Sequence, residues 1–404
     1  MYPDLSYFFH DLFGTDVDNW TSIFKTFGVF LALTFISAYH IIKKELIRKE
    51  EEGLIQKIII ENPNESVSAW KESLINGLIG FFFGFKIPYI YQNFEAFKAD
   101  PASQIFTSDG NYLTGSLLGV LLAVYYYFNI KNQPPVPKGT KLYEHPYQKA
   151  GTIILIAAFT GILGSRLLSI LENLDSFFED PMGQLLSGSG LTIYGGLILA
   201  AICVALYARK IGIKVAHMAD VAAPALLLGY GVGRMGCQLS GDGDWGIANT
   251  APKPDWFIFP DWAWAYDYPR NVADLYQRGE KIADCVGNFC THLNPPVFPT
   301  PIYEVITSLI LFFIVWSYRK KIKTPGRLFF LYVFLSGFSR FFVEMIRVNP
   351  RYDLLGLGWS MSQWISAILV FVGLIGFFKL RGDKKPEHDY TIPDMPVEKE
   401  VKNS

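Results

Sequence analysis

The sequence predicts an all-α, polytopic integral membrane protein with about nine transmembrane helices. Half of its 404 residues are hydrophobic and only 18% are charged, whereas a soluble chain carries roughly a quarter charged residues. Leu191–Ala208 has no charge in 18 positions and Ser360–Phe378 has none in 19. These runs approach the roughly 20 residues that cross a bilayer. The net charge of -1 gives no overall basicity that would indicate a nucleic-acid partner.

Nine apolar segments can be assigned as membrane spans. They are Ser22–Ile42, Leu74–Tyr91, Leu113–Ile130, Ala150–Leu171, Leu191–Ala208, Val215–Leu239, Ile302–Tyr318, Leu328–Ile346 and Ser360–Phe378. Lys and Arg follow every odd-numbered span, and basic flanks stay in the cytoplasm. The pattern therefore predicts an N-terminus outside and a C-terminus inside. The second span is the least regular, because Lys86 and Pro88 interrupt it.

The chain divides by composition into three expected parts. Residues 1–148 hold the N-terminal spans, and residues 149–381 form a core with a polar, extracytoplasmic section at 240–300. Residues 382–404 are polar and are expected to be a disordered cytoplasmic tail. The N-terminus lacks the basic start of a signal peptide, so the first span is expected to stay in the mature protein.

The four cysteines have different expected roles. Cys203 lies in an apolar run and is expected to pack there. Cys237 lies near the end of the sixth span. Cys285 and Cys290 share the outer polar section, where either a disulfide or a pair of free thiols is compatible with the sequence.

An internal repeat emerges when the chain is compared with itself at a shift of 80 residues. The matches are Gly84 with Gly164, Lys86 with Arg166, Asn93 with Asn173, Phe97 with Phe177, Asp100-Pro101 with Asp180-Pro181, Gln104 with Gln184, Gly110 with Gly190, and Gly115 with Gly195. We interpret this pattern as a duplicated hairpin of a span with a cation, an outer loop and a returning span. Chance similarity of two apolar hairpins is the alternative.

Several ionisable residues fall at membrane depth, where an arginine costs about 2.5–3.5 kcal/mol at a helix centre. Arg166, Arg234, Arg340 and Glu344 lie in three different spans, and Arg347 follows the eighth. Arg340 and Glu344 are spaced i, i+4 and could form a structural ion pair. The arginines outnumber the carboxylates in these spans. Unless the neighbouring acidic turn supplies the balance, an external phosphate is the natural partner, since guanidinium binds phosphate bidentately.

Two polar motifs lie near the outer membrane boundary. The turn S-G-D-G-D-W-G carries Asp242 and Asp244, for which a solvated turn or a calcium loop is also possible. Tyr194, at the start of the fifth span, could be an interfacial anchor, and Gly195-Gly196 permits close helix contact or ligand approach.

Four motifs in this order resemble the bacterial prolipoprotein diacylglyceryl transferase family: Y-G-G-L, G-R-M-G-C-Q-L-S-G-D-G-D-W-G, P-T-P-I-Y-E and R-F-F-V-E-M-I-R. The resemblance spans roughly residues 150–378. It departs from the family pattern at Tyr194, where the family has a histidine, and at Cys237 and Ser240, where it has asparagines. Asp242 takes the place of the family's glutamate, or Asp244 does, because the turn is one residue longer.

The resemblance implies transfer of a diacylglyceryl group from phosphatidylglycerol to the lipobox cysteine of a prolipoprotein, with release of glycerol phosphate. The implied catalytic residues are Arg234, Arg340, Glu344, Tyr194, Asp242 and Asp244. The implied substrate-binding residues are Arg234, Arg166, Gly195, Gly196, Gln238 and Arg347. No metal or cofactor is expected. The implied location is the bacterial inner membrane, with the site toward the periplasmic face.

Two other functions remain open from the sequence. The same arginines could serve an anionic-lipid or anion transporter, although the motifs cluster at one membrane face. Tyr194 in place of the motif histidine would also suit an inactive homologue that binds lipid or signal peptide.

Overall fold

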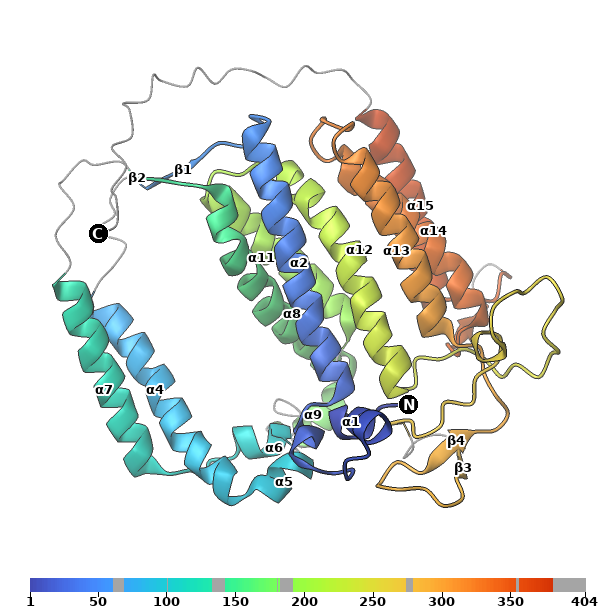
Figure 1. Ribbon diagram of the computed structural model, residues 1–404. Coiled ribbons are helices and arrows are strands. Elements are labelled where there is room, and N and C mark those ends of the chain that lie inside the picture. Colours follow the sequence, from blue (N-terminus) through green and yellow to red (C-terminus); the bar gives the residue numbers. More distant parts are fainter. Residues whose placement is uncertain are drawn as a thin grey trace.

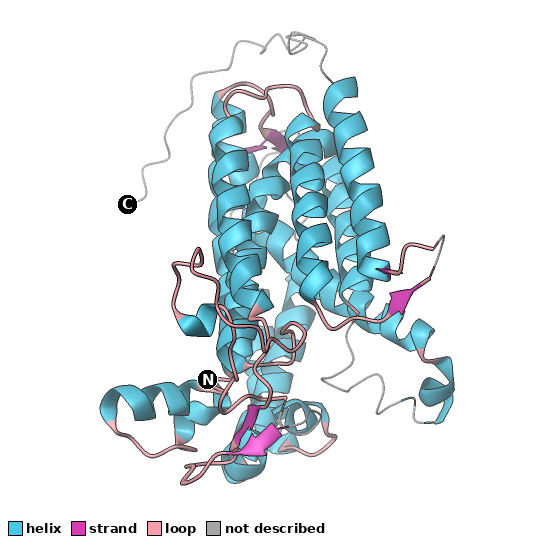
Figure 2. Cartoon of the chain, turned by 90° about the vertical axis from the view of Figure 1, so that its right-hand side faces the viewer, coloured by secondary structure: helices cyan, strands magenta, loops and turns pink. Residues whose placement is uncertain are grey.

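Long helices run side by side through this protein, and most of its loops and short helices gather at one end (Figures 1 and 2). The computed structural model describes residues 1–60, 69–99, 101–132, 142–179, 181, 192–273, 279–353 and 356–380. Among these residues, eight helical segments are long and apolar enough to cross a membrane. The chain is therefore a multi-pass membrane protein, and the predicted all-α fold class is confirmed.

The long helices are α2 (Thr26–Glu51), α4 (Ala69–Gln92), α7 (Tyr112–Lys131), α8 (Ala150–Glu172), α11 (Ile193–Lys210), α12 (Val215–Ser240), α13 (Thr300–Tyr318), α14 (Arg327–Val343) and α15 (Met361–Lys379). The short helices are α1 (Leu5–Phe13), η1 (Trp20–Ile23), α5 (Phe94–Ala99), α6 (Pro101–Phe106), η2 (Pro146–Lys149), α9 (Leu174–Glu179), η3 (Asp261–Ala263) and η4 (Glu344–Ile346). Three antiparallel pairs of strands complete the described structure: β1 (Ile58–Ile60) with β2 (Leu142–Glu144), β3 (Gly279–Lys281) with β4 (Thr291–Leu293), and β5 (Arg351–Tyr352) with β6 (Trp359–Ser360).

Each of the nine predicted spans corresponds to one long helix. Eight of them meet the length and hydropathy requirements for crossing a membrane, and α11, with 18 residues, is the ninth helix outside that set. Helix α2 continues past Ile42, so the basic flank that follows the first span is helical too. Pro88 does not interrupt the second span, because α4 continues through it to Gln92. Membrane helices tolerate such a proline when nearby groups satisfy the freed backbone.

Helix α12 occupies the middle of the bundle, between α2 and α13 (Figure 1). Glycines allow its neighbours to approach closely. A methyl group on Gly236 would lie 2.8 Å from Phe30 Cβ of α2, and one on Gly231 would lie 3.4 Å from Ser308 of α13. The Ser308 hydroxyl donates to Leu227 O across the same interface, at 2.5 Å. Small residues of this kind let membrane helices pack through van der Waals contact.

A buried polar network fixes the end of the bundle that carries the basic flanks. Asp220, in α12, accepts hydrogen bonds from Gly326 N at 2.9 Å and Phe329 N at 3.0 Å, which satisfies the free backbone donors at the start of α14. Lys49 Nζ lies 3.4 Å from the same carboxylate. Because this aspartate caps a helix and pairs a buried lysine, it joins α2, α12 and α14 at one point.

Two hairpins share detailed geometry at a spacing of 80 residues. The first hairpin comprises α4 to α7, and the second comprises α8, α9 and α11. A methyl group on Gly84 would lie 2.5 Å from Thr114 O, and one on Gly164 would lie 2.4 Å from Gly195 O. The amides after both first helices also bond alike, Asn93 Nδ2 to Tyr89 O at 3.0 Å and Asn173 Nδ2 to Ser169 O at 3.1 Å. The two asparagine contacts correspond at a shift of 80, whereas the glycine contacts differ by one position, because Thr114 aligns with Tyr194. Several aligned positions lie outside the described residues, so the duplication stays a prediction.

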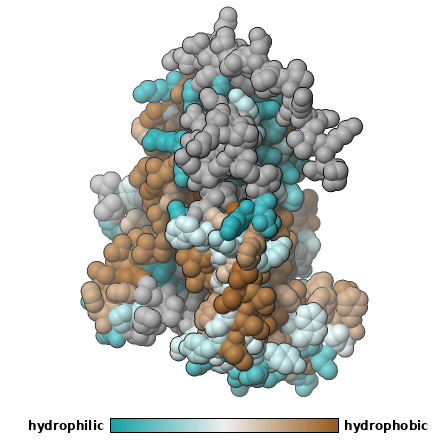
Figure 3. All heavy atoms as spheres, turned by 90° about the vertical axis from the view of Figure 1, so that its left-hand side faces the viewer, coloured by the Kyte–Doolittle hydropathy of each residue, from teal (hydrophilic) through white to brown (hydrophobic). Residues whose placement is uncertain are grey.

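The first hairpin stands apart from the other long helices (Figure 1). Seen from its own side, apolar side chains cover much of the lower half of the molecule, and hydrophilic ones gather at the lower edge (Figure 3). Lys86 is buried here, and its ammonium group donates to the backbone oxygens of Gln104, Thr107 and Asp109 at 2.5–3.3 Å. The lysine predicted as the cation of the first hairpin therefore binds the segment that joins α4 to α7.

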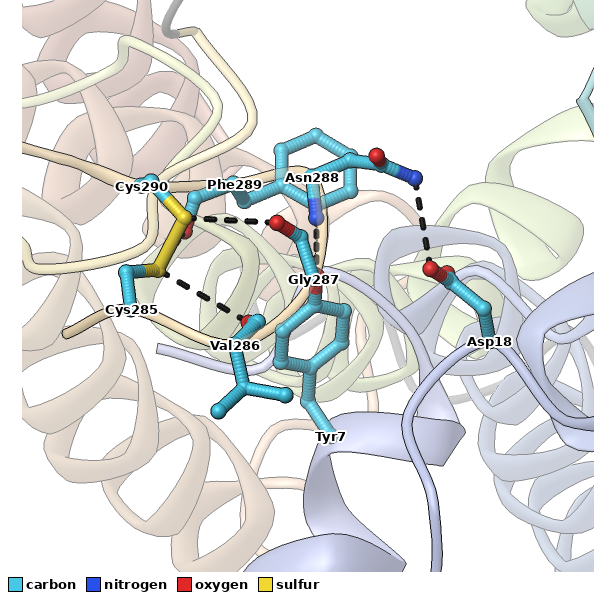
Figure 4. Close-up of a disulfide and its surroundings, with 8 residues drawn as sticks. All are labelled: Tyr7, Asp18, Cys285, Val286, Gly287, Asn288, Phe289 and Cys290. Atoms are coloured by element: carbon cyan, nitrogen blue, oxygen red, sulfur yellow. Dashed lines mark hydrogen bonds between the residues drawn. A yellow bond between two sulfur atoms is a disulfide. The ribbon is translucent and has the colours of Figure 1, made fainter.

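A disulfide closes a short loop of the outer polar section, and hydrogen bonds join this loop to the N-terminal segment. Cys285 and Cys290 are bonded, with their Cα atoms 5.6 Å apart, so the disulfide alternative is confirmed (Figure 4). The backbone of Asn288, inside this loop, donates to the hydroxyl of Tyr7 in α1 at 3.0 Å. Its side chain donates to Asp18 at 3.3 Å. The segment before α2 is thereby held at the end of the bundle opposite the basic flanks.

Candidate active site

The C-terminal end of α12 changes from an apolar helix into the acidic turn, residues 240–246. Gly241 ends the helix with φ 66° and Gly243 has φ 98°, and both lie in the left-handed region that glycine adopts without a steric penalty. Gly246 is fixed by close packing, since a methyl group there would lie 2.5 Å from Ile346 O. The turn therefore brings Asp244 back over the last turns of α12 and beside η4.

Arg234 occupies the centre of the site and is buried. Its Nε atom lies 2.9 Å from Glu304 Oε2, and its Nη1 atom pairs with Asp244 Oδ2. It also donates from Nε to the hydroxyl of Tyr230, one turn earlier in α12, at 3.1 Å. A single guanidinium thus contacts α12, the acidic turn and α13.

Two further arginines contact these carboxylates, Arg340 near the end of α14 and Arg347 directly after η4. Arg340 Nη1 lies 2.5 Å from Glu304 Oε1, and Arg347 Nη1 lies 3.4 Å from Glu304 Oε2. Arg347 Nη2 also lies 2.7 Å from Asp244 Oδ1. Asp244 consequently bridges two guanidinium groups, and Glu304 bridges three.

The third carboxylate, Glu344, is fully buried in η4. Arg340 Nη2 lies 3.1 Å from Glu344 Oε2, which confirms the i, i+4 pair that the sequence suggested. Ser360 Oγ donates to Glu344 Oε1 at 2.9 Å, and Asn349 Nδ2 donates to the same oxygen. Ser360 begins α15 with a capping box, so Glu344 ties the late helices to the site.

We call this set the arginine cluster: Tyr230, Arg234, Asp244, Glu304, Arg340, Glu344 and Arg347. Its charges balance, because three guanidinium groups face three carboxylates. The expected surplus of arginine over carboxylate is therefore wrong for these residues. The acidic turn supplies one of the missing charges, and Glu304 supplies the other.

Cys237 and Asp242 lie at the edge of the cluster. Cys237 is a free, buried cysteine, and its Sγ atom lies 3.9 Å from Arg234 Nη1. The Cys237 sulfur and carboxylate oxygens of Asp242 and Asp244 lie within 4.8 Å of one another. Both oxygens of Asp244 already face arginines, so this group is an extension of the ion network and does not fit a dedicated metal site.

The remaining predicted site residues lie on the neighbouring helices. Tyr194, in α11, is partly exposed, and its hydroxyl lies 3.4 Å from Ser362 Oγ in the first turn of α15. Gly195 and Gly196 lie against α8, since methyl groups there would meet Gly164 O at 2.2 Å and Ser165 Oγ at 2.3 Å. The structure therefore uses both glycines for close helix contact.

Arg166 and Gln238 are both buried. Arg166 lies in α8 beside the helix crossing made by Gly164. Gln238 accepts a hydrogen bond from the hydroxyl of Tyr268 at 2.8 Å, which directs its side chain oxygen to the outer polar section. The binding roles predicted for these two residues remain predictions.

Two members of the cluster were not among the predicted site residues. Glu304 ends the motif P-T-P-I-Y-E at the start of α13, and Tyr230 precedes Arg234 by four residues. The signal for Tyr230 was its i, i+4 spacing, which places both side chains on one face of α12. The signal for Glu304 was a carboxylate within the first turns of an apolar helix.

Comparison with known proteins decides the family. Residues 137–379 match the family model described as prolipoprotein diacylglyceryl transferase, which is more than half of the chain. The chain belongs to the prolipoprotein diacylglyceryl transferase family. It is therefore a membrane-embedded enzyme of the transferase class, and the predicted resemblance is confirmed.

Similar proteins bear the name phosphatidylglycerol–prolipoprotein diacylglyceryl transferase. The chain is 31% identical to the one from Dehalococcoides mccartyi over 245 residues, which are 60% of this chain and 81% of that protein. It is 32% identical to the one from Clostridium tetani over 224 residues, 55% of this chain and 77% of the relative. The protein from Corynebacterium glutamicum is 28% identical over 239 residues, 58% of this chain and 70% of that protein.

The match to the prolipoprotein diacylglyceryl transferase family includes the whole arginine cluster and Tyr194. It does not include α2 or the first hairpin, which precede residue 137. The first hairpin therefore lies outside the part of the chain that defines the family.

Proposed function

We propose that this protein transfers a diacylglyceryl group from phosphatidylglycerol to the cysteine thiol of a prolipoprotein. The thiolate sulfur forms a bond to the glyceryl carbon that carries the phosphate ester. The carbon–oxygen bond to phosphate breaks, and glycerol phosphate leaves with that electron pair. The thiol proton passes to a carboxylate of the enzyme. The atoms and charges of the two substrates balance without a cofactor.

The convergence of Arg234, Arg340 and Arg347 is the observation that carries this proposal. Guanidinium groups at a buried site stabilise negative charge where it develops, and here that charge develops on the departing phosphate. We assign phosphate binding to Arg234, Arg340 and Arg347, with Arg166 as a helper. The shared carboxylate of Glu304 supports the assignment, because it holds all three guanidinium groups of the cluster in one orientation.

A carboxylate is the proposed proton acceptor. A free cysteine has a pKa near 8.5, so the substrate thiol must lose its proton before or during attack. Asp242, Asp244 and Glu344 are the candidates, since all three lie in or beside the arginine cluster. Tyr194 is proposed to orient a substrate through its hydroxyl, because an unperturbed phenol has a pKa near 10 and is a poor base at neutral pH.

We place the protein in the bacterial inner membrane with the arginine cluster toward the periplasm. The basic flanks and the cluster lie at opposite ends of the long helices, and basic flanks stay in the cytoplasm. The disulfide in the outer polar section suits an oxidising compartment. Residues 149–381 form the proposed transferase core, and the first hairpin is an accessory. The proposed tail, 382–404, lies outside the described residues.

The decisive experiment uses the purified chain in nanodiscs that contain phosphatidylglycerol, together with a peptide that carries a lipobox cysteine. Mass spectrometry should detect a diacylglyceryl increase on the thiol. Matched controls replace the peptide cysteine with serine or the lipid with phosphatidylcholine, and neither should give product. Lipid binding without any product would instead favour the inactive, lipid-binding homologue that Tyr194 suggests.

A further inference from the structure

Asp244 differs from the other two carboxylates of the arginine cluster in how it is held. Its side chain is 34% exposed, whereas those of Glu304 and Glu344 are 3% and 0% exposed. Glu304 also accepts from Tyr230, and Glu344 from Ser360. Within the cluster, the Asp244 carboxylate pairs with two arginines, Arg234 and Arg347. It is therefore the cluster carboxylate that water can most readily solvate.

The position of Asp244 matches what a phosphodiester would require. Its two oxygens divide between Arg234 and Arg347, one oxygen to each guanidinium. An anionic lipid has two charged oxygens on one phosphorus atom and can make the same pair of charge-assisted bonds. The Nε atom of Arg347 is buried and donates no hydrogen bond among the described residues. A phosphate group, with four oxygens, could use this additional donor.

Charge balance favours replacement of the Asp244 carboxylate by the phosphodiester over binding of the phosphodiester beside it. With Asp244 in place, the cluster has three positive and three negative groups. A phosphodiester that entered beside Asp244 would leave one unbalanced negative charge at a mostly buried site. If the Asp244 side chain instead rotates into the solvent, the phosphodiester replaces it as the partner of the two arginines, and the cluster stays neutral.

The acidic turn leaves the Asp244 side chain room for that movement. Gly243 precedes Asp244, has positive φ, and has open space around it apart from Ala273. Trp245 follows and is buried, and Gly246 is packed against η4. The backbone of Asp244 is held, because its N–H donates to Asp242 Oδ1 at 3.3 Å and its carbonyl accepts from Thr300 Oγ1 at 2.9 Å. The carboxylate can therefore move by rotation of the Asp244 side chain, without displacement of the rest of the turn.

We propose that Asp244 is a place-holding carboxylate that keeps Arg234 and Arg347 paired until the phosphodiester of an anionic lipid displaces it. This inference rests on the proposed function for the identity of the lipid. Asp244 competes with the lipid, so it sets the affinity and the anion selectivity of the site. It acts as a positioning residue through the two arginines.

Removal of the place-holder charge should strengthen anion binding. Asp244→Asn in phosphatidylcholine nanodiscs should bind added phosphatidylglycerol roughly tenfold more tightly than wild type, since close charge pairs couple strongly. Asp244→Glu keeps a carboxylate and should retain affinity near that of wild type. Asp261→Asn removes an exposed carboxylate elsewhere in the outer section and should also change nothing. Equal or weaker binding by Asp244→Asn would overturn the proposal.

A measurement on the wild-type chain covers the case in which Asp244→Asn does not fold. A water-soluble carbodiimide with glycinamide labels accessible carboxylates, and peptide mass spectrometry reports labelling at Asp244. Phosphatidylglycerol should increase labelling at Asp244, and phosphatidylcholine should not. Unchanged or reduced labelling with phosphatidylglycerol would contradict displacement.

The transfer assay separates this inference from the proposed function. Product formation by wild type, without tighter binding by Asp244→Asn and without extra labelling, would reject the place-holder and leave the transferase proposal intact. Tighter binding and extra labelling without product would reject the proposed reaction and leave the anion exchange intact.

Discussion

Glu304 Oε2 lies 2.9 Å from Arg234 Nε, and this contact joins α13 to α12. The two residues are 70 positions apart in the chain. The other oxygen of Glu304 lies 2.5 Å from Arg340 Nη1. One carboxylate in α13 therefore sets the distance between arginines of α12 and α14. The geometry of the site depends on this residue as much as on the arginines that it holds.

Glu304→Gln should therefore disorganise the site and lower stability. The change leaves three guanidinium groups with two carboxylates, and loss of one partner from a buried ion pair costs about 3–5 kcal/mol. Thermal unfolding in detergent and the transfer assay measure the two effects. Glu280→Gln, an exposed carboxylate in β3, is the matched control and should resemble wild type. Wild-type stability and turnover in Glu304→Gln would contradict the central role of this residue.

Arg234→Ala should abolish most transfer, by roughly a hundredfold to a thousandfold, because it removes a donor aimed at developing negative charge. Arg234→Lys should recover little, since a single ammonium group cannot reproduce the fork of a guanidinium. Initial rates of lipidation at saturating peptide give the comparison. Arg270→Ala, which removes a partly exposed arginine paired with Asp11, should keep wild-type rates. Normal turnover in Arg234→Ala would disprove phosphate binding by this residue.

Tyr194→Phe tests whether the hydroxyl has a role. A lost hydrogen bond of about 0.5–1.5 kcal/mol corresponds to a two- to tenfold drop in kcat/KM. A larger loss would indicate that the phenol takes part in proton transfer. Tyr91→Phe, an exposed tyrosine in α4, controls for general effects of a lost hydroxyl. An unchanged rate in Tyr194→Phe would leave the tyrosine as an interfacial anchor.

Lys86→Met and Arg166→Met form a matched pair from the two hairpins. Lys86 donates to three backbone oxygens of its own loop, so its loss should reduce stability by about 1–3 kcal/mol and leave transfer unchanged. Arg166→Met should lower the transfer rate if Arg166 helps to bind phosphate. Transfer rates and unfolding temperatures of both variants show whether each residue acts in transfer or in stability. Equal loss of transfer in the two variants would argue against an accessory role for the first hairpin.

Two tyrosines of the outer polar section, the half-buried Tyr266 and the buried Tyr268, predict a loss of stability at alkaline pH. Burial raises the pKa of Tyr266 to about 12 and raises that of Tyr268 further above its usual range. An unfolded tyrosine titrates near pH 10, so the folded state binds these protons more tightly. The stabilisation is complete below about pH 10 and is lost as the pH rises from about 10 to about 12. Unfolding temperatures across this range should fall, and less steeply in Tyr268→Phe.

The sequence predicted the helices and most of the charged site because both depend on local signals. Apolar length and basic flanks located all nine long helices, and the i, i+4 spacing located the pair of Arg340 and Glu344. Glu304 was overlooked because its partners come from other helices, and no spacing rule relates α13 to α12 or α14. The same lack of information produced the expected surplus of positive charge.

The direction of a side chain was equally hard to predict. Gln238 follows Arg234 by one turn and shares its face, yet its oxygen accepts from Tyr268, which the outer section places there. Lys86 and Arg166 align in the repeat, but alignment alone could not reveal that Lys86 contacts the carbonyls of its own loop. Such choices depend on long-range packing, which a single sequence does not record.

The ribbon of β1 and β2 has a consequence for how this chain could be shortened or extended. Ile58 pairs with Glu144 and Ile60 with Leu142, so the points where the chain leaves for the first hairpin and returns from it are neighbours. Insertions are best tolerated where entry and exit lie close together. The hairpin also packs along its own glycines, and it needs few contacts from the rest of the protein. It has the properties of a removable module, and a short turn between residues 60 and 142 would join the remaining parts of the chain.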